Sequence, residues 1–335
     1  MSIRVAINGF GRIGRLTLRA LLERKDKDIK IVAINDLTDL KSIMHLLKYD
    51  SLHYELKNNL KIDGDSIFID DQKISFFSEK NPELIPWDKT KTDIVIESTG
   101  FFASKTESEK HLRGSVKKVL VSAPCKNADI TVVYGVNHKK LAKDHKIISN
   151  GSCTTNCLAP LVYLIDKDIG IISGYMTTVH AVTGDQKTID TFHKDLRRAR
   201  NSSISMIPTS TGAAKAVGEV LPNLVGKLDG SAIRVPTANV SLIDFCFQSK
   251  RETTSDEINK IIKNASNNQF KNIIQIVNEP MVSVDFNHNP HSSILDAQET
   301  KVISNSFCRI LSWYDNEWGF SNRLIDVTKE LFKTL

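Results

Sequence analysis

Residues 3–14 read Ile-Arg-Val-Ala-Ile-Asn-Gly-Phe-Gly-Arg-Ile-Gly, and this stretch decides the fold of the first part of the chain. Its apolar, β-branched start predicts a strand, which runs directly into Gly9, Gly11 and Gly14 in Gly-x-Gly-x-x-Gly spacing. Apolar residues at helical spacing follow the glycines. A strand, a glycine-rich turn and a helix in this order are typical of a dinucleotide-binding unit.

An acidic residue at the end of the next predicted strand strengthens this interpretation. Residues 29–34 are apolar and lead to Asp36, 22 positions after Gly14, close to the ~20 residues expected for the group that binds an adenosine ribose. The glycines, with Arg12 and Ile13 at the helix start, should let a pyrophosphate approach the helix N-terminus. Asp36 would accept hydrogen bonds from both ribose hydroxyls and repel a 2′-phosphate, which predicts NAD rather than NADP as the cofactor.

The rest of residues 1–150 alternates between strand-like and helix-like segments. Further strands are expected at 67–69, 74–77, 93–97, 119–122, 131–134 and 147–149. Ligands of parallel sheets bind outside the carboxyl ends of the strands, so Thr99 and Ser122 should line the cofactor cleft. We therefore expect an α/β fold whose NAD-binding domain, residues 1–150, is a Rossmann-type doubly wound sheet.

The second part of the chain has a different pattern, with longer strand-like runs that follow one another closely. These runs lie at 171–183, 233–235, 240–248, 281–286 and 307–314, and helices are expected at about 213–221 and 255–265. This pattern is typical of an α+β domain with a mainly antiparallel or mixed sheet, which we assign to residues 151–316. Residues 317–335 have helical spacing and are expected to pack back on the first domain.

A cysteine marks the junction between these two parts. Residues 149–160 read Ser-Asn-Gly-Ser-Cys-Thr-Thr-Asn-Cys-Leu-Ala-Pro and lead from a strand into a helix. Cys153 thus lies at a helix start, where free backbone N–H groups and a partial positive charge favour the thiolate. A cysteine at such a place is more often a small buried hydrophobe, and we interpret Cys157 in that way. The hydroxyl and amide groups around Cys153 favour a nucleophile.

The amino-acid composition limits the classes of protein to which this chain can belong. The chain has 335 residues, 41% of them hydrophobic and 25% charged, as expected for a globular protein of two domains. Its five cysteines, an odd number, do not suggest a disulfide framework, and we expect a reducing cytoplasm. The sequence contains no apolar run of membrane-spanning length and no signal-peptide pattern at its N-terminus.

The net charge of +6 is modest and suits anionic substrates. Basic residues are scattered without interleaved aromatic residues, so no nucleic-acid partner is required. Cys153 and Cys157 are spaced as a helical pair, which leaves open a non-catalytic redox or metal-binding protein. No second Cys or His pair at ligand spacing follows, and no metal is expected.

Several segments around these residues match the motifs of one family. They are Ser-Cys-Thr-Thr-Asn-Cys at 152–157, Thr-Thr-Val-His at 177–180, His-Lys-Asp-Leu-Arg-Arg-Ala-Arg at 193–200, Thr-Ser-Thr-Gly-Ala-Ala-Lys at 209–215, Arg-Val-Pro-Thr at 234–237 and Trp-Tyr-Asp-Asn-Glu-Trp-Gly at 313–319. With them, the chain resembles the phosphorylating glyceraldehyde-3-phosphate dehydrogenases from Ile3 to its C-terminal helix.

The resemblance implies a catalytic pair and two anion sites. Cys153 would be the nucleophile and His180 its acid and base, because an aldehyde gives up a hydride only after a thiol has added to it. The substrate phosphate would contact Thr183, Arg198 and Arg234, and the inorganic phosphate would contact Ser152, Thr154, Thr211 and Gly212. Asn316 would hold the nicotinamide amide of NAD.

The family also implies a glycolytic homotetramer that oxidises D-glyceraldehyde 3-phosphate to 1,3-bisphosphoglycerate through a cysteine thioester. A sister activity, erythrose-4-phosphate dehydrogenase, shares the cysteine and histidine and remains an alternative. Thr191 and Phe192 stand where NAD-specific members often carry Leu-Pro, a departure that argues against strict NAD specificity, whereas Asp36 argues for it.

Overall fold

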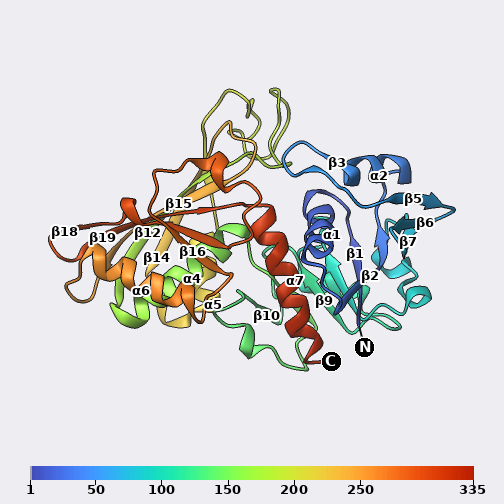
Figure 1. Cartoon of the computed structure of the whole chain (residues 1–335), viewed down its shortest axis with the longest axis horizontal. Helices are drawn as coiled ribbons and strands as arrows, with labels where there is room; N and C mark the ends of the chain where they lie inside the picture. Colours follow the sequence, from blue (N-terminus) through green and yellow to red (C-terminus); the bar gives the residue numbers. More distant parts are fainter. Residues whose placement is uncertain (1) are drawn as a thin grey trace. The chain divides into compact units, whose positions relative to one another are not determined.

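The computed structural model describes residues 2–335, and the chain divides into two compact units (Figure 1). The first unit runs to Val132 and adds Asn137–Gly151 and Ser321–Leu335. The second consists of Val133–Val136 and Ser152–Phe320. Among the described residues, no helix has both the length and the apolar character that crossing a bilayer requires.

The first unit is built on a sheet whose central strands are parallel. Its order is β10-β11-β9-β8-β1-β2-β7-β6-β5. The strands are β1 (Ile3–Asn8), β2 (Ile29–Asn35), β5 (Leu60–Asp63), β6 (Ser66–Ile69), β7 (Gln72–Phe77), β8 (Ile94–Glu97), β9 (Lys118–Val121), β10 (Ile130–Thr131) and β11 (Ile147–Ser149). The run β7-β2-β1-β8-β9-β11 has the 3-2-1-4-5-6 order of a Rossmann sheet, which confirms the predicted fold class.

Helix α1 (Arg12–Arg24) returns the chain from β1 to β2, its parallel neighbour. Gly14 allows this helix to start close to the sheet, because a Cβ at this position would lie 2.4 Å from the carbonyl oxygen of Gly9. The other short elements of the unit are α2 (Leu40–Lys48), α3 (Lys105–Ser108) and the two-stranded ribbon of β3 (Tyr49–Asp50) and β4 (Tyr54–Glu55).

The C-terminal helix α7 (Trp318–Phe332) contributes its residues from Ser321 onward to the first unit. Leu324, Val327 and Leu331 are completely buried. Two ion pairs link this part of α7 to the end of α1 and the turn after it: Arg24 Nη2 lies 2.7 Å from Asp326 Oδ1, and Lys329 Nζ lies 2.6 Å from Asp26 Oδ2.

The second unit contains a mixed sheet of order β13-β14-β12-β15-β19-β17-β16, with β18 paired to β19. Its strands are β12 (Ile171–His180), β13 (Ile207–Ser210), β14 (Leu228–Arg234), β15 (Ser241–Ser249), β16 (Ile274–Val277), β17 (Ser293–Asp296), β18 (Lys301–Ile303) and β19 (Phe307–Tyr314). β12 and β14 are parallel, as are β16 and β17, and the other pairs are antiparallel. The predicted mixed sheet is therefore confirmed.

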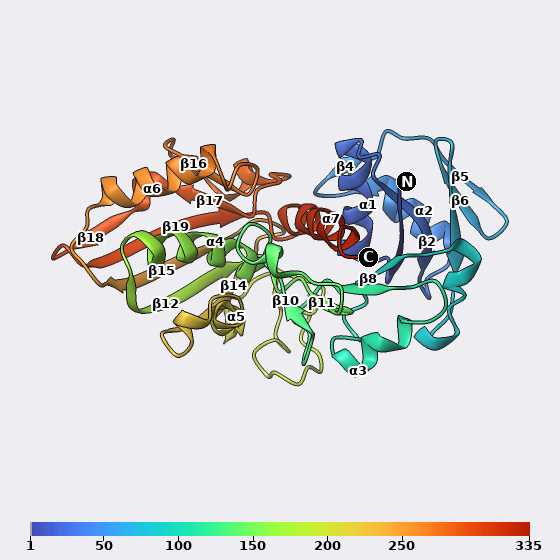
Figure 2. The ribbon, with the colours of Figure 1, turned by 90° about the horizontal axis from the view of Figure 1, so that it is seen from below.

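Three helices cover one face of this sheet: α4 (Cys153–Asp168), α5 (Ala213–Val220) and α6 (Ser255–Asn267) (Figure 1). Figure 2 shows the same helices lying in front of β12, β14, β15 and β19. The core of the unit lies between them, where Leu158, Val162 and Phe245 are fully buried. β15 alternates buried with half-buried residues because only one of its faces meets the helices.

The strand predicted at 281–286 is wrong. Ser283–Phe286 forms a turn of 3-10 helix, in which the Asp285 carboxylate accepts a hydrogen bond from the backbone N–H of Val282. Val282 and Val284 are exposed, and only Phe286 is buried in this turn. Apolar residues alone therefore suggested a strand where a local carboxylate bond stabilises a turn. The short strands β13, β16, β17 and β18 were not predicted.

Candidate active site

A pocket of about 920 Å³ opens in the first unit where β1, β2 and β8 end. Four of the residues predicted to bind the cofactor line it: Gly9, Gly11, Asp36 and Thr99. Other lining residues include Asn8 and Asn35, which end β1 and β2, and Phe101, which follows β8. The pocket thus lies at the carboxyl ends of neighbouring parallel strands, as expected for a dinucleotide site.

The local geometry of this pocket fits a dinucleotide. Gly9 has a φ of +85°, and a Cβ there would lie 2.6 Å from the backbone nitrogen of Thr99, so only glycine fits. The Asp36 carboxylate accepts hydrogen bonds from the backbone N–H of Phe10 at 2.6 Å and of Thr38 at 2.8 Å. These bonds orient the carboxylate and leave further lone pairs for ribose hydroxyls.

The remaining predicted cofactor residues do not line this pocket. Gly14 and Ile13 lie in the first turn of α1, where Arg12 uses its side chain to pair with Asp50 at 2.5 Å. Ser122 follows β9 and donates its backbone N–H to the backbone carbonyl oxygen of Glu97. Asn316 belongs to the second unit, where its side-chain oxygen accepts a hydrogen bond from Ser241 Oγ at 2.9 Å.

The second unit brings Cys153 and His180 together. Cys153 is the first residue of α4, whose N-cap Ser152 accepts a hydrogen bond from the backbone N–H of Thr155. His180 is the last residue of β12, and its Nε2 lies 3.5 Å from Cys153 Sγ. This distance allows a proton to pass between a thiol and an imidazole, which is the arrangement of an activated cysteine.

Burial shifts the pKa values of Cys153 and His180. It raises the pKa of the Cys153 thiol, an effect that the nearby Arg234 charge opposes. Burial, together with the charge of Arg234, lowers the pKa of His180 to about 3. Desolvation thus outweighs the hydrogen bonds of the helix start, which lower the pKa of the thiol through the backbone N–H groups of Cys153 and Thr154. Both shifts favour the neutral forms, a thiol beside an imidazole.

Arg234, the last residue of β14, contacts the other side of the imidazole ring. Its Nη1 lies 2.5 Å from His180 Nδ1, which is also 2.7 Å from the carbonyl oxygen of Ala181. A guanidinium only donates and a carbonyl only accepts, so Nδ1 satisfies one partner at a time. A proton on Nδ1 leaves Nε2 free to accept the proton of Cys153, whereas a bond accepted from Arg234 puts the ring proton on Nε2.

Thr154, predicted to bind inorganic phosphate, is buried and bonded to Tyr314. Tyr314 Oη lies 2.8 Å from Thr154 Oγ1 and 2.9 Å from Thr178 Oγ1. Because Thr178 donates its only hydroxyl proton to the carbonyl oxygen of Leu242, Tyr314 donates to Thr178 and accepts from Thr154. The Thr154 hydroxyl proton is thus committed, and its backbone N–H is the group left for an anion.

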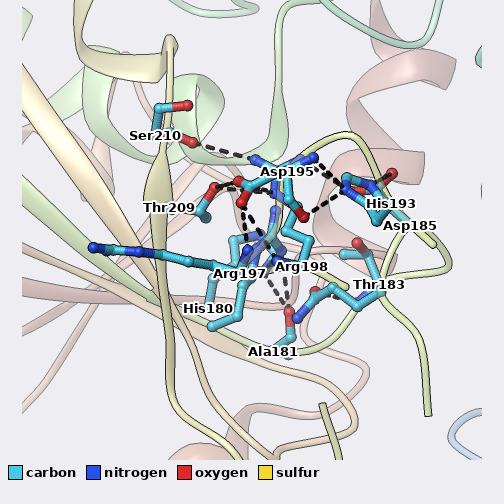
Figure 3. A network of polar contacts seen from close by, with 12 residues as sticks. His180, Ala181, Thr183, Asp185, His193, Asp195, Arg197, Arg198, Thr209 and Ser210 are labelled. Atoms are coloured by element: carbon cyan, nitrogen blue, oxygen red, sulfur yellow. Dashed lines mark hydrogen bonds and ion pairs between the residues drawn. The ribbon is translucent and has the colours of Figure 1, made fainter. Parts of the chain in front are cut away.

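Arg198 is held by other side chains of the second unit. Figure 3 shows it among Asp185, Asp195, Thr209 and Ser210. Nη1 of Arg198 lies 2.9 Å from Asp185 Oδ2, and Nε donates to Thr209 Oγ1 at 3.0 Å. Thr183, labelled in the same view, donates its backbone N–H to Gln186. A phosphate that binds Arg198 must therefore compete with the carboxylate of Asp185.

The last predicted anion residues lie at the start of α5. Gly212 precedes this helix, and Thr211 Oγ1 accepts a hydrogen bond from the backbone N–H of Ala213. Thr155 Oγ1 lies 3.5 Å from the carbonyl oxygen of Ala213, which brings the starts of α4 and α5 together. Two helix N-termini that meet in this way favour a bound anion.

Sequence reasoning missed two features of these sites. Tyr314 was noticed only as part of a matching motif, and nothing in the sequence indicated its bonds to Thr154 and Thr178. Asn8 and Asn35, which line the cofactor pocket, had a usable signal, because each is a polar residue at the end of a predicted parallel strand. Cys157 is fully buried, as predicted for a packing residue.

The first unit is a Rossmann sheet with a pocket at its strand ends, and the second is a mixed-sheet unit with a cysteine beside a histidine. This combination is typical of an NAD-dependent dehydrogenase. Comparison with known proteins specifies the family. Residues 3–105 match the NAD binding domain of glyceraldehyde 3-phosphate dehydrogenase, and residues 152–316 match its C-terminal domain. The chain belongs to the glyceraldehyde-3-phosphate dehydrogenase family, and its cofactor is NAD.

Full-length relatives carry the same family name. The chain is 53% identical to a glyceraldehyde-3-phosphate dehydrogenase of Xanthobacter flavus over 99% of both chains. It is 50% identical to that of Zymomonas mobilis over 100% of both, and 48% identical to that of Geobacillus stearothermophilus over 98% of this chain and 97% of the relative.

Proposed function

We propose that this chain oxidises D-glyceraldehyde 3-phosphate with NAD and inorganic phosphate, and so forms 1,3-bisphosphoglycerate in glycolysis. The observation that carries the proposal is the 3.5 Å approach of Cys153 Sγ to His180 Nε2 in a chain of this family. The first unit supplies the pocket for NAD, and the second supplies the thiol and the imidazole.

The proposed reaction begins when the thiol of Cys153 adds to the aldehyde carbon. The thiol proton passes to His180, the new C–S bond forms, and the protonated imidazole returns the proton to the oxygen to give a hemithioacetal. NAD, when bound, accepts the hydride from this carbon. His180 takes the hydroxyl proton as the hydride leaves, which yields a thioester on Cys153. Inorganic phosphate then attacks the thioester, and the sulfur leaves as the thiolate.

The second unit offers two kinds of anion-binding group for the two phosphates. Arg234 and Arg198, with Thr183, would hold the phosphate of the substrate, because a guanidinium presents paired donors to phosphate oxygens. The starts of α4 and α5, with Ser152, Thr154, Thr211 and Gly212, would hold the inorganic phosphate. The contact between Thr155 and Ala213, which joins these two helix starts, supports the second assignment.

The test is NAD reduction with glyceraldehyde 3-phosphate, with and without inorganic phosphate or arsenate. We expect steady turnover only when one of the two anions is present, because only an anion that attacks the thioester regenerates Cys153. A burst of NADH of about one equivalent per chain is expected without either anion. Turnover that does not depend on phosphate or arsenate would contradict the acyl-transfer step.

The sister activity with erythrose 4-phosphate has no support from the comparisons, since the relatives named above are glyceraldehyde-3-phosphate dehydrogenases. Initial rates with both aldehydes provide the direct check. We expect a higher kcat/KM for glyceraldehyde 3-phosphate, and the reverse order would overturn this part of the proposal. The same assay with NAD and NADP measures how strictly Asp36 selects the cofactor in the presence of Thr191 and Phe192.

We also propose a homotetramer in a reducing cytoplasm. A loop of the second unit exposes large apolar side chains that water solvates poorly; they are Ile189, Phe192, Leu196, Ile204 and Met206, each at least 69% exposed. An interface between copies would bury them. The cysteines of the described residues are all unpaired, which suits a reducing compartment. Sedimentation equilibrium tests the assembly, and a monomer at micromolar concentration would contradict it.

A further inference from the structure

Three polar side chains stand in register at the carboxyl ends of three neighbouring strands in the first unit. Asn8 of β1 pairs with Asn35 of β2 on one side and with Glu97 of β8 on the other. All three are buried, with at most 4% of their surface exposed. Burying polar groups in a row is costly unless each is hydrogen-bonded, so their partners need to be identified.

Glu97 is the centre of this row. Its Oε1 accepts hydrogen bonds from the backbone N–H of Thr99 at 2.7 Å and from the Thr99 hydroxyl at 2.5 Å. Its Oε2 accepts from Asn8 Nδ2 at 2.6 Å and lies 3.1 Å from His111 Nε2. Four donors thus converge on two oxygens, the number that a carboxylate in a buried site requires.

The proton on His111 is placed by a neighbouring indole. Trp87 Nε1, which can only donate, lies 3.2 Å from His111 Nδ1. Nδ1 is therefore the acceptor, and the ring proton of a neutral His111 sits on Nε2, facing Glu97. His111 has no exposed surface and Trp87 only 2%, so the hydrogen bonds from Trp87 to His111 and from His111 to Glu97 are shielded from water.

This buried chain ends at the cofactor pocket. Thr99, Asn8 and Asn35 line the pocket, whereas Glu97 and His111 lie behind them and do not. Asn35 Nδ2 donates to Asn8 Oδ1 at 2.8 Å, so the row continues from Glu97 across the pocket floor. Thr99 is also the residue whose backbone lies against Gly9, the first glycine of the dinucleotide-binding turn.

We propose that Glu97, oriented by His111 and Trp87, is a positioning residue for NAD. It holds Thr99 and Asn8 in the places that the cofactor requires, so the pocket is formed before NAD arrives. Its effect is on cofactor affinity and not on the chemistry of Cys153, because it touches neither the thiol nor the imidazole. The inference rests on NAD as the cofactor and does not depend on which aldehyde is oxidised.

Glu97→Gln tests the role of the carboxylate. One oxygen becomes an NH₂ group, so a single acceptor oxygen faces four donors and not all four hydrogen bonds can be kept, while the volume changes little. We expect the Kd of NAD, measured by calorimetry, to rise about ten-fold or more. The KM for NAD should rise with it, while kcat at saturating NAD and the alkylation rate of Cys153 without NAD stay within about two-fold. Glu109→Gln, at an exposed ion pair with Lys105, is the control and should change none of these quantities.

A pair of substitutions at His111 separates polarity from packing. In His111→Gln, the amide NH₂ can donate to Glu97 while its oxygen accepts from Trp87, so NAD affinity should be largely kept. His111→Leu fills the space but leaves Glu97 and Trp87 each short of a partner, and the Kd of NAD should rise about ten-fold.

Two outcomes would overturn the inference. One is a folded Glu97→Gln variant that binds NAD within two-fold of the wild-type chain. The other is an equal loss of affinity in His111→Gln and His111→Leu, which would make His111 a packing residue and remains measurable if Glu97→Gln fails to fold. Because NAD binding is measured without aldehyde, failure of the proposed aldehyde oxidation would leave these results unchanged and so remain distinguishable.

Discussion

Nη1 of Arg234 lies 2.5 Å from Nδ1 of His180, on the side of the ring opposite to Cys153. The residue proposed to bind the substrate phosphate is thus in direct contact with the residue proposed to move the proton. When Arg234 donates to Nδ1, the ring proton is on Nε2 and the imidazole cannot accept the thiol proton. A phosphate that draws the guanidinium away would leave Nδ1 to donate to the carbonyl of Ala181 and free Nε2 as a base.

Arg234→Leu should separate phosphate recognition from thiol chemistry. Loss of charge-assisted hydrogen bonds to a phosphate costs about 1.5–3 kcal/mol, so the KM for glyceraldehyde 3-phosphate should rise about 10- to 150-fold. Turnover of glyceraldehyde, which has no phosphate, should change much less. Arg200→Leu, at an exposed ion pair with Asp190, is the control. Equal losses with both aldehydes would show that Arg234 does not recognise the phosphate.

Cys153→Ser should abolish turnover while NAD binding is kept, because the cofactor pocket belongs to the other unit. A hydroxyl is a far weaker nucleophile than a thiol beside the same imidazole. Cys157→Ser is the matched control, one turn along the same helix, where the sulfur contacts the hydroxyls of Ser293 and Ser312. Steady-state NADH formation and calorimetric titration with NAD provide the two readouts. Loss of NAD binding in Cys153→Ser would assign the residue a structural role.

His180→Asn should slow alkylation of Cys153 by iodoacetamide near neutral pH. Burial raises the pKa of Cys153, so the thiol is the main form at neutral pH and the thiolate fraction grows as the pH rises. In the wild-type chain the alkylation rate should therefore increase with pH through neutrality. Without the imidazole to accept the proton, the variant should fall below the wild-type rate and lose turnover by about 10²- to 10⁴-fold. An alkylation rate equal to that of the wild type would remove His180 from this role.

Tyr314→Phe should lower stability, because it removes the hydroxyl that bonds to Thr154 Oγ1 on one side and to Thr178 Oγ1 on the other. The buried hydroxyl of Thr154 would lose its acceptor, and Thr178 would lose a donor. An unpaired buried group costs about 1–3 kcal/mol, which urea denaturation resolves. Tyr175→Phe, at a side chain that is 52% exposed, should be neutral by comparison. Equal stability of the two variants would show that the hydrogen bonds of Tyr314 Oη to Thr154 and Thr178 do not stabilise the fold.

Local sequence signals determined the first unit and the position of the cysteine. Gly9, Gly11 and Gly14 come after one strand, and Asp36 directly follows the next one, so both ends of the expected cofactor site could be predicted from neighbouring residues. These signals are local because turn, helix start and strand end each depend on a few adjacent residues. The short strands β16 and β17 lacked such a signal, since their pairing depends on partners far along the chain.

Only the tertiary structure decided the charges and the hydrogen-bond partners of the site. Cys153 lies beside His180 although the two are 27 positions apart in the sequence. Arg234, 54 positions after His180, contacts the other side of the same ring. The helix start favours the thiolate, as the sequence indicates, but desolvation depends on everything packed around the sulfur and raises the pKa of Cys153 by more than the helix start lowers it. For the same reason the Glu97 row was invisible in the sequence. A buried carboxylate is recognised by the donors that surround it, and those donors come from β1, from the segment after β8 and from His111.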